Sequence, residues 1–211
     1  SQDIDAITTY TMSFDDNINE PNSYWAVTAS NILTPLEVML DTASALHDSG
    51  NGVENIIITH ADFLEQAEDL ATFRASQGLR TILVDLQDIF DQFSYGITDP
   101  LSIKRFLAYA YANWDDPAPS FVLLVGDGHY DPKDYLGYGR SSFVPPLLTM
   151  ADPGIGETAT DNRYVTLIGE DPLPDMMIGR LAVNTPLEAA AMINKIIEYE
   201  EMPPSQEWQR R

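Results

Sequence analysis

The chain has 211 residues, 44% of them apolar, and a formal net charge of −22, because 33 acidic residues outnumber 11 lysines and arginines. A charge this negative repels phosphates, which excludes a nucleic-acid partner and argues against docking on anionic membranes. Because cysteine is absent, these residues hold no disulfide, no thiolate metal site and no cysteine nucleophile, and no apolar run is long enough for membrane insertion.

Residues 1–50 differ in composition from the rest of the chain. Residues 7–14 and 23–28 are rich in β-branched and aromatic side chains, and the acidic, proline-containing stretch between them is typical of a turn. We interpret residues 1–50 as the end of a preceding β-rich domain with a linker, and residues 51–211 as the next domain.

From residue 51 onward, short apolar strands alternate with amphipathic helices. Asp62, Asp99 and Thr185 are helix start signals, each followed by apolar residues at helical spacing. Residues 85–96 form a loop or a short helix, and residues 131–160 show no clear period, which is typical of a long functional loop or an excursion. The predicted strands are residues 54–59, 79–84, 121–125, 164–168 and 176–182.

The strand at residues 121–125 is the most informative of these segments. Its apolar run stops at Gly126 and Asp127, which is typical of a strand buried on both faces. Strands that alternate with helices predict an α/β fold with a mostly parallel sheet flanked by helices. In such folds, ligands bind beyond the carboxyl ends of the strands, where Asp127 and His129 follow this strand.

The histidines are the first candidates for chemistry. His129 lies at a strand end, but the sequence has neither a cysteine nor a Gly-x-Ser-x-Gly motif, so a structural, loop-ordering role is favoured over catalysis. His60 is interpreted in the same way, as a residue that bonds its own loop, and His47 as a solvated residue of the linker. Residues 126–131 do not form a phosphate-binding loop, because they lack the Lys-Ser/Thr pair and the glycine spacing of the known motifs.

Acidic side chains near the last predicted strand are the second candidates. Calcium takes six to eight oxygen ligands from loops, and two flanking loops could close Asp161 and Asp175 around one ion. The spacing does not match an EF-hand, so solvated acidic loops remain the alternative. Arg180, in or beside a strand among these acids, is expected to make an internal ion pair.

Six segments of the chain, taken in order, carry a family resemblance: residues 55–63, 74–81, 121–127, 160–164, 178–180 and 197–200. They include Gly126-Asp127 after the buried strand, the Thr160-Asp161 segment that ends at Tyr164, and Gly179-Arg180. Through these segments the chain resembles the gingipain-type cysteine peptidases, from about residue 24 to residue 208.

The resemblance implies a caspase-like α/β fold of two side-by-side subdomains, of which this chain would be the first. The catalytic histidine of the family, in a Gly-His-Gly motif, and its catalytic cysteine would then follow Arg211, in the second subdomain. It also implies structural calcium, with Asp161 and Asp175 as carboxylate ligands and Arg163 as a main-chain carbonyl ligand.

Two functions are consistent with this resemblance. The first is the scaffolding, amino-terminal portion of a secreted or surface cysteine endopeptidase, inactive alone, whose partner is the carboxy-terminal catalytic subdomain and whose substrates are proteins or peptides. The alternative is a non-catalytic interaction or secretion-machinery module of the same fold. Both imply an extracellular or cell-surface location.

Overall fold

The computed structural model describes residues 42–139, 142–154, 156–169 and 171–202, with a few isolated positions before residue 42. The chain divides into two compact units, Ser1–Asp41 and Thr42–Arg211. Of the two expected β segments, residues 7–14 lie outside the described residues except for residue 13, whereas the described part of the second segment, residue 23 and residues 26–28, forms no strand. The division falls at residue 41, whereas the sequence placed the start of the second domain at residue 51.

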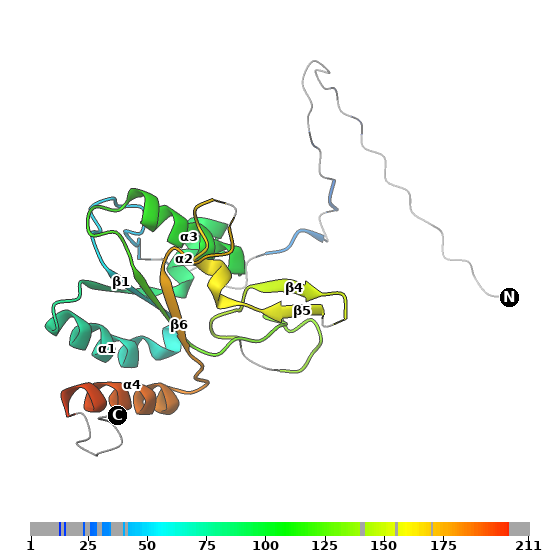
Figure 1. The fold of residues 1–211 in the computed structure, drawn as a ribbon. Coiled ribbons are helices and arrows are strands. Elements are labelled where there is room, and N and C mark those ends of the chain that lie inside the picture. Colours follow the sequence, from blue (N-terminus) through cyan, green and yellow to red (C-terminus); the bar gives the residue numbers. More distant parts are fainter. Residues whose placement is uncertain are drawn as a thin grey trace. The chain divides into compact units, whose positions relative to one another are not determined.

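A parallel sheet of four strands forms the centre of the second unit (Figure 1). The strand order is β2-β1-β3-β6, and every neighbouring pair is parallel. Ile56, Ile57 and Ile58 in the inner strand β1 have no exposed surface, because helices cover both faces of the sheet. The strands are β1 Asn55–Thr59, β2 Thr81–Asp85, β3 Phe121–Val125 and β6 Met177–Leu181.

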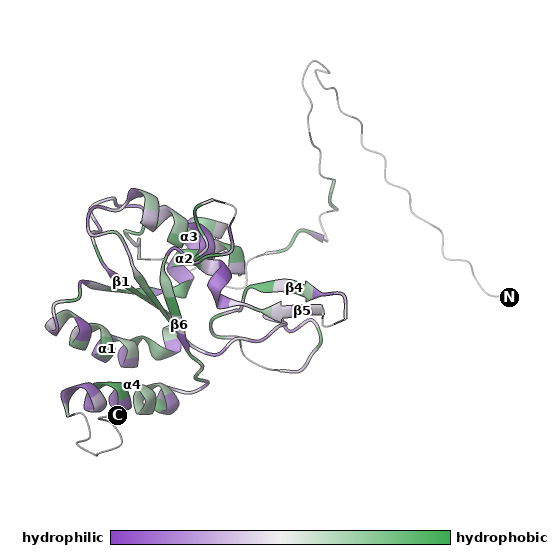
Figure 2. Cartoon of the chain, viewed as in Figure 1, coloured by the Kyte–Doolittle hydropathy of each residue, from purple (hydrophilic) through white to green (hydrophobic). Residues whose placement is uncertain are grey.

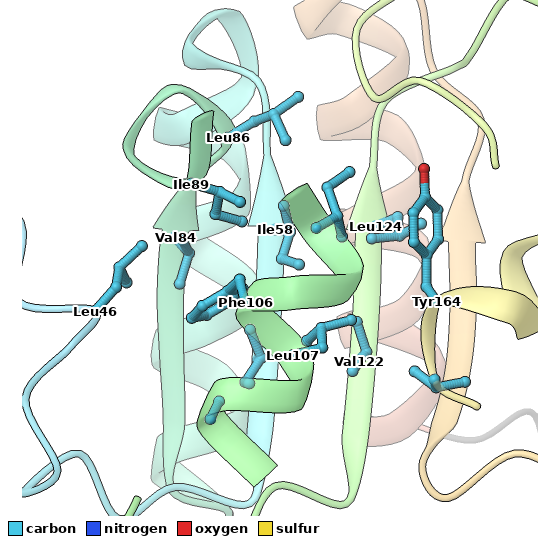
Figure 3. Close-up of a cluster of buried hydrophobic side chains, with 14 of the residues drawn as sticks. Leu46, Ile58, Val84, Leu86, Ile89, Phe106, Leu107, Val122, Leu124 and Tyr164 are labelled. Atoms are coloured by element: carbon cyan, nitrogen blue, oxygen red, sulfur yellow. The ribbon is translucent and has the colours of Figure 1, made fainter. Parts of the chain in front are cut away.

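Two pairs of helices cover the sheet. Helices α1 (Leu64–Ser76) and α4 (Pro186–Glu201) pack with Ile57 on one face, whereas α2 (Leu86–Ser94) and α3 (Pro100–Asn113) pack with Ile56 and Ile58 on the other. Successive side chains of a strand point to opposite faces, which is why three consecutive isoleucines serve two cores. Figure 2 shows the apolar strands at the centre and polar residues along the outer helices, and Figure 3 shows α3 lying across the second core.

Local start and stop signals set most helix boundaries as expected. The side chains of Asp85, Asp99 and Thr185 accept hydrogen bonds from main-chain N–H groups in the first turns of α2, α3 and α4. Gly78 follows α1 with a φ of +87°, a conformation that glycine adopts without strain. The expectation for Asp62 was wrong: His60 caps a short 3₁₀ helix, η2 (Ala61–Phe63), that precedes α1.

Two segments between β3 and β6 differ from the sequence prediction. The stretch without clear periodicity contains an antiparallel hairpin of β4 (Leu148–Asp152) and β5 (Gly156–Ala159). The strand expected at residues 164–168 is absent, because Tyr164 instead ends a 3₁₀ helix, η3 (Asp161–Tyr164). The Tyr164 ring is fully buried in the α2–α3 core (Figure 3). The apolar residues that predicted a strand at 164–168 therefore reflect burial in this core.

Residues 42–51 form a strap that packs on α2 and α3. Leu46 is 4% exposed and belongs to the same core, and its carbonyl accepts a hydrogen bond from the indole of Trp114 at 3.1 Å. The His47 ring stacks on Phe93 with 4.5 Å between centroids, and its main-chain carbonyl accepts a hydrogen bond from the Tyr109 hydroxyl. His47 is therefore part of the folded unit and not a free linker residue.

Candidate functional site at the carboxyl edge of the sheet

Arg180, in the edge strand β6, connects four segments at the carboxyl edge of the sheet. Its Nε and Nη2 atoms each donate to one carboxylate oxygen of Asp161 in η3, both at 2.8 Å. Its Nη1 atom donates to the carbonyl of Gly126, which follows β3, at 2.8 Å and to the carbonyl of Val144 at 2.7 Å. The Arg180 side chain is 14% exposed, so the predicted internal ion pair is a largely buried clamp.

Tyr164 holds the same region through its hydroxyl. This group donates to the carbonyl of Pro145 at 2.7 Å, next to the carbonyl of Val144 that Arg180 holds. Burial raises the pKa of Tyr164 far above its usual range, and the Arg180 charge opposes this rise only in part. The hydroxyl therefore stays protonated and remains a donor at all physiological pH values.

The loop after β3 is held by hydrogen bonds to the main-chain carbonyl and the carboxylate of Asp127. Asp127 accepts main-chain hydrogen bonds from Phe143 and Val144, and its carboxylate accepts from the main chain of Gly128 and from the Asn184 amide. A Cβ atom on Gly128 would lie 2.6 Å from the Val144 carbonyl oxygen, so only glycine fits there. The glycine at this position thus allows the close packing of the loop against residues 144–146.

Histidines at this edge order loops. The Nδ1 atom of His129 accepts a hydrogen bond from the main chain of Asp131 at 3.3 Å, and its ring lies against Tyr130. The Nδ1 atom of His60 accepts from the main chain of Asp62 at 3.2 Å, and its ring contacts Phe143 edge-on. Both arrangements match the loop-ordering role that the sequence favoured over catalysis.

The predicted calcium ligands Asp161 and Asp175 line two different hollows. Asp161 lines one of about 370 Å³ together with Asp127 and Glu157, and Asp175 lines one of about 540 Å³ beside Asn162 and Met177. Both aspartates lie near η3. Asp161 is its first residue, and the main-chain N–H of Asp175 donates to the carbonyl of Val165, which follows η3. Within the described residues, no group of three or more His, Cys, Asp or Glu side chains is arranged to hold a metal ion.

Each carboxylate already has partners. Both oxygens of Asp161 accept from Arg180, whose positive charge opposes a cation, so Asp161 does not fit a calcium ligand in this arrangement. One oxygen of Asp175 accepts from the main chains of Leu167 and Ile168, and these hydrogen bonds hold the pKa of Asp175 below its usual range. Asp175 is therefore charged at neutral pH. Arg163, the predicted carbonyl ligand, belongs to the same short helix, η3, as Asp161.

A calcium titration tests the predicted site at Asp161, Arg163 and Asp175. A site formed by these residues would stabilise the chain by about 2.7 kcal/mol at a calcium concentration one hundred times its Kd. Thermal unfolding with calcium, with magnesium and with chelator measures this, and Asp175→Asn should abolish any calcium effect. An unchanged melting temperature would mean that Arg180 neutralises Asp161 in place of an ion.

These elements define a parallel α/β domain whose carboxyl edge is fixed by hydrogen bonds and contains no cysteine. The chain belongs to peptidase family C25, whose sequence model matches residues 48–211. This confirms the gingipain-type resemblance, and the α/β fold with a mostly parallel sheet flanked by helices is confirmed as caspase-like.

Three known proteins show how much of the family the chain covers. Gingipain R2 of Porphyromonas gingivalis (strain ATCC BAA-308 / W83) is 26% identical over 145 residues, which are 69% of this chain and 16% of Gingipain R2. Dimeric latent PorU from Porphyromonas gingivalis is 28% identical, with a TM-score of 0.58, over 74% of this chain and 16% of that chain. The complex of RgpB pro- and mature domains, also from Porphyromonas gingivalis, is 24% identical, with a TM-score of 0.52, over 69% of this chain and 29% of that chain, and shows the fold alone.

Proposed function

We propose that this chain is the scaffolding, amino-terminal portion of a gingipain-like cysteine endopeptidase. The family match over residues 48–211, in a sequence without cysteine, is the observation that carries this proposal. A cysteine peptidase needs a thiolate nucleophile, a general acid/base and an oxyanion hole. The cysteine and the catalytic histidine would come from polypeptide that follows Arg211, and this chain alone would be inactive.

Scaffolding has a definite physical meaning here. Loops at the carboxyl edge of a parallel sheet are the usual place for binding and catalysis, and they work only when their positions are fixed. Arg180 and Tyr164 fix the main chain at Val144, Pro145 and Gly126. The proposed partner is the carboxy-terminal catalytic subdomain, which would pack against this rigid domain, and proteins or peptides would be substrates of the whole.

The proposed location is extracellular or at the cell surface. The family relationship to Gingipain R2 and the likeness to PorU support it. In the part of the chain that the structure describes, no helix has the length and apolarity required to span a bilayer.

A second candidate function is a non-catalytic interaction or secretion-machinery module. The structural similarity to PorU, a protein described in a dimeric latent state, supports this second candidate. The reading frame after Arg211 distinguishes the two: a Gly-His-Gly segment followed by a cysteine after a strand supports the peptidase, and their absence supports the module.

Peptidase assays test the proposal directly. We expect the isolated chain to show no turnover of fluorogenic peptides, and turnover to appear when it is produced together with the following sequence. His129→Ala in that longer protein should leave the specific activity of the folded enzyme unchanged, since His129 only orders a loop. Turnover by the isolated chain that His129→Ala abolishes would overturn the proposal.

A further inference from the structure

Three exposed tyrosines lie close together in the chain after β3. Tyr130, Tyr135 and Tyr138 are 53%, 82% and 60% exposed, and Leu136 between them is also exposed. We call residues 130–138 the tyrosine loop. A surface tyrosine offers a large, rigid contact with a polar tip, and aromatic side chains are enriched where proteins bind one another. Several of them in one loop therefore indicate an interaction surface.

Hydrogen bonds fix the main chain of the tyrosine loop. Asp131 is buried, and its carboxylate accepts from the main-chain N–H of Leu136 at 2.7 Å. The carboxylate of Asp134 accepts from the main-chain N–H of Gly139 at 3.0 Å, and Asp134 itself has a φ of +51°. A loop held in this way presents its side chains in one arrangement, so a partner that binds them does not have to order the loop first.

Tyr130 connects the tyrosine loop to the hollow of about 370 Å³ at the carboxyl edge of the sheet. It lines this hollow together with Leu148 of β4 and Glu157 of β5. The chain after β3 accordingly runs beside the β4–β5 hairpin (Figure 1). The His129 ring contacts the rings of both Tyr130 and Tyr138, with 4.5 and 6.4 Å between centroids. The exposed tyrosines and the hollow therefore form one surface.

The charge of this surface indicates which partner it binds. Residues 126–161 contain six acidic side chains and two basic ones, Lys133 and Arg140. The hollow is lined by the carboxylates of Asp127, Glu157 and Asp161, and its Arg180 is already bound to Asp161. A negative surface of this kind attracts cations, and the face of a tyrosine ring binds an ammonium or guanidinium group.

We propose that the tyrosine loop and the hollow together bind an extended segment of a partner protein that is rich in lysine or arginine. The hollow takes one cationic side chain, and Tyr135 and Tyr138 take the apolar stems and the charged groups of the side chains next to it. Phosphates are repelled by the same carboxylates, so a nucleic acid or an anionic membrane does not fit.

This inference goes beyond the proposed function and does not depend on it. Binding of a basic segment is a property of this chain alone, and it holds equally for a catalytic parent and for an interaction module. The experiment below therefore measures binding and no turnover, so that its failure would leave the peptidase proposal unaffected.

Fluorescence anisotropy of a labelled peptide of alternating lysine and leucine, titrated with the full 211-residue chain, tests the proposal. We expect saturable binding, and the double variant Tyr135→Ala/Tyr138→Ala should raise the Kd by about tenfold or more, because aromatic side chains carry much of the binding energy of an interface. The matched control is Tyr95→Ala, which removes an almost fully exposed tyrosine at the end of α2 and should leave the Kd unchanged. Since all three tyrosines are exposed, the variants should melt with the wild type.

A second pair of variants tests the charge of the hollow. Glu157→Gln should weaken binding of the lysine peptide, whereas Glu198→Gln, an exposed glutamate of α4, should not. The same peptide with glutamate in place of lysine should not bind. Equal Kd values for the wild type and the tyrosine double variant would show that only the overall negative charge attracts the peptide, and would overturn the proposal. Undetectable binding of the lysine peptide, or equal binding of the glutamate peptide, would overturn it as well.

Discussion

Replacing Arg180 with alanine is expected to lower the free energy of unfolding by about 3 kcal/mol, the lower end of the range for breaking a buried ion pair. The variant leaves Asp161 charged without a partner and removes the donor from the carbonyls of Gly126 and Val144. Asp161 is 28% exposed, so water can solvate its carboxylate in the variant, which is why we expect a loss of stability at the lower end of that range. Urea denaturation of the 211-residue chain measures this value.

A surface ion pair of the same chain supplies the control. The Nη1 atom of Arg105 lies 3.0 Å from the Oδ2 atom of Asp99, but the Arg105 side chain is 53% exposed. Arg105→Ala should therefore lower the free energy of unfolding by less than about 1 kcal/mol. Arg180→Lys should recover only part of the stability, because one ammonium group cannot reach the carboxylate and both carbonyls as the guanidinium fork does. Equal losses for Arg180→Ala and Arg105→Ala would show that the clamp contributes little.

Shortening Leu46 to alanine is expected to lower the free energy of unfolding by about 2–5 kcal/mol, the usual range for a buried leucine. Leu46 is 4% exposed and packs in the α2–α3 core (Figure 3), although it precedes the matched family region that begins at residue 48. The strap would lose its apolar anchor while the hydrogen bond between Trp114 and the Leu46 carbonyl could remain. Chemical denaturation followed by circular dichroism measures the effect.

Leu40 is the matched control for this substitution. Its side chain is fully exposed and it belongs to the first unit, so Leu40→Ala should change the stability by less than about 0.5 kcal/mol. Removal of residues 1–41 should likewise leave the unfolding of the second unit unchanged, whereas removal of residues 1–51 should destabilise it. A harmless Leu46→Ala would mean that the strap is not needed for the fold.

Much of the fold could be predicted from the sequence because its signals are local. The apolar run at residues 121–125 became β3 with the same bounds, and Asp99 and Thr185 cap α3 and α4 as expected. Such signals depend on side-chain periodicity and on hydrogen bonds within one turn of helix, which neighbouring residues alone provide. The hairpin of β4 and β5 escaped prediction because its strands are short and mostly exposed, so they lack the apolar alternation of a half-buried strand.

The candidate site depended on contacts that no local pattern encodes. The sequence indicated that Arg180 would pair with an acid, but it offered Asp161 and Asp175 as partners of one calcium ion and did not link either to Arg180. The structure placed Arg180 opposite Asp161 and gave Asp175 to the main chain of residues 167 and 168. Which acid pairs with Arg180 depends on how β6 packs against η3, and Arg180 and Asp161 are nineteen residues apart in the sequence.

By itself, the sequence determined the family, the parallel α/β architecture and the absence of a cysteine nucleophile, because motif order, periodicity and composition are properties of the chain alone. Only the tertiary structure decided that Leu46 and His47 belong to the folded unit, that Tyr164 is a core residue rather than part of a strand, and that Arg180 binds Asp161. Burial and ion pairing between distant segments depend on the geometry with which the elements pack, and that geometry exists only in the folded chain.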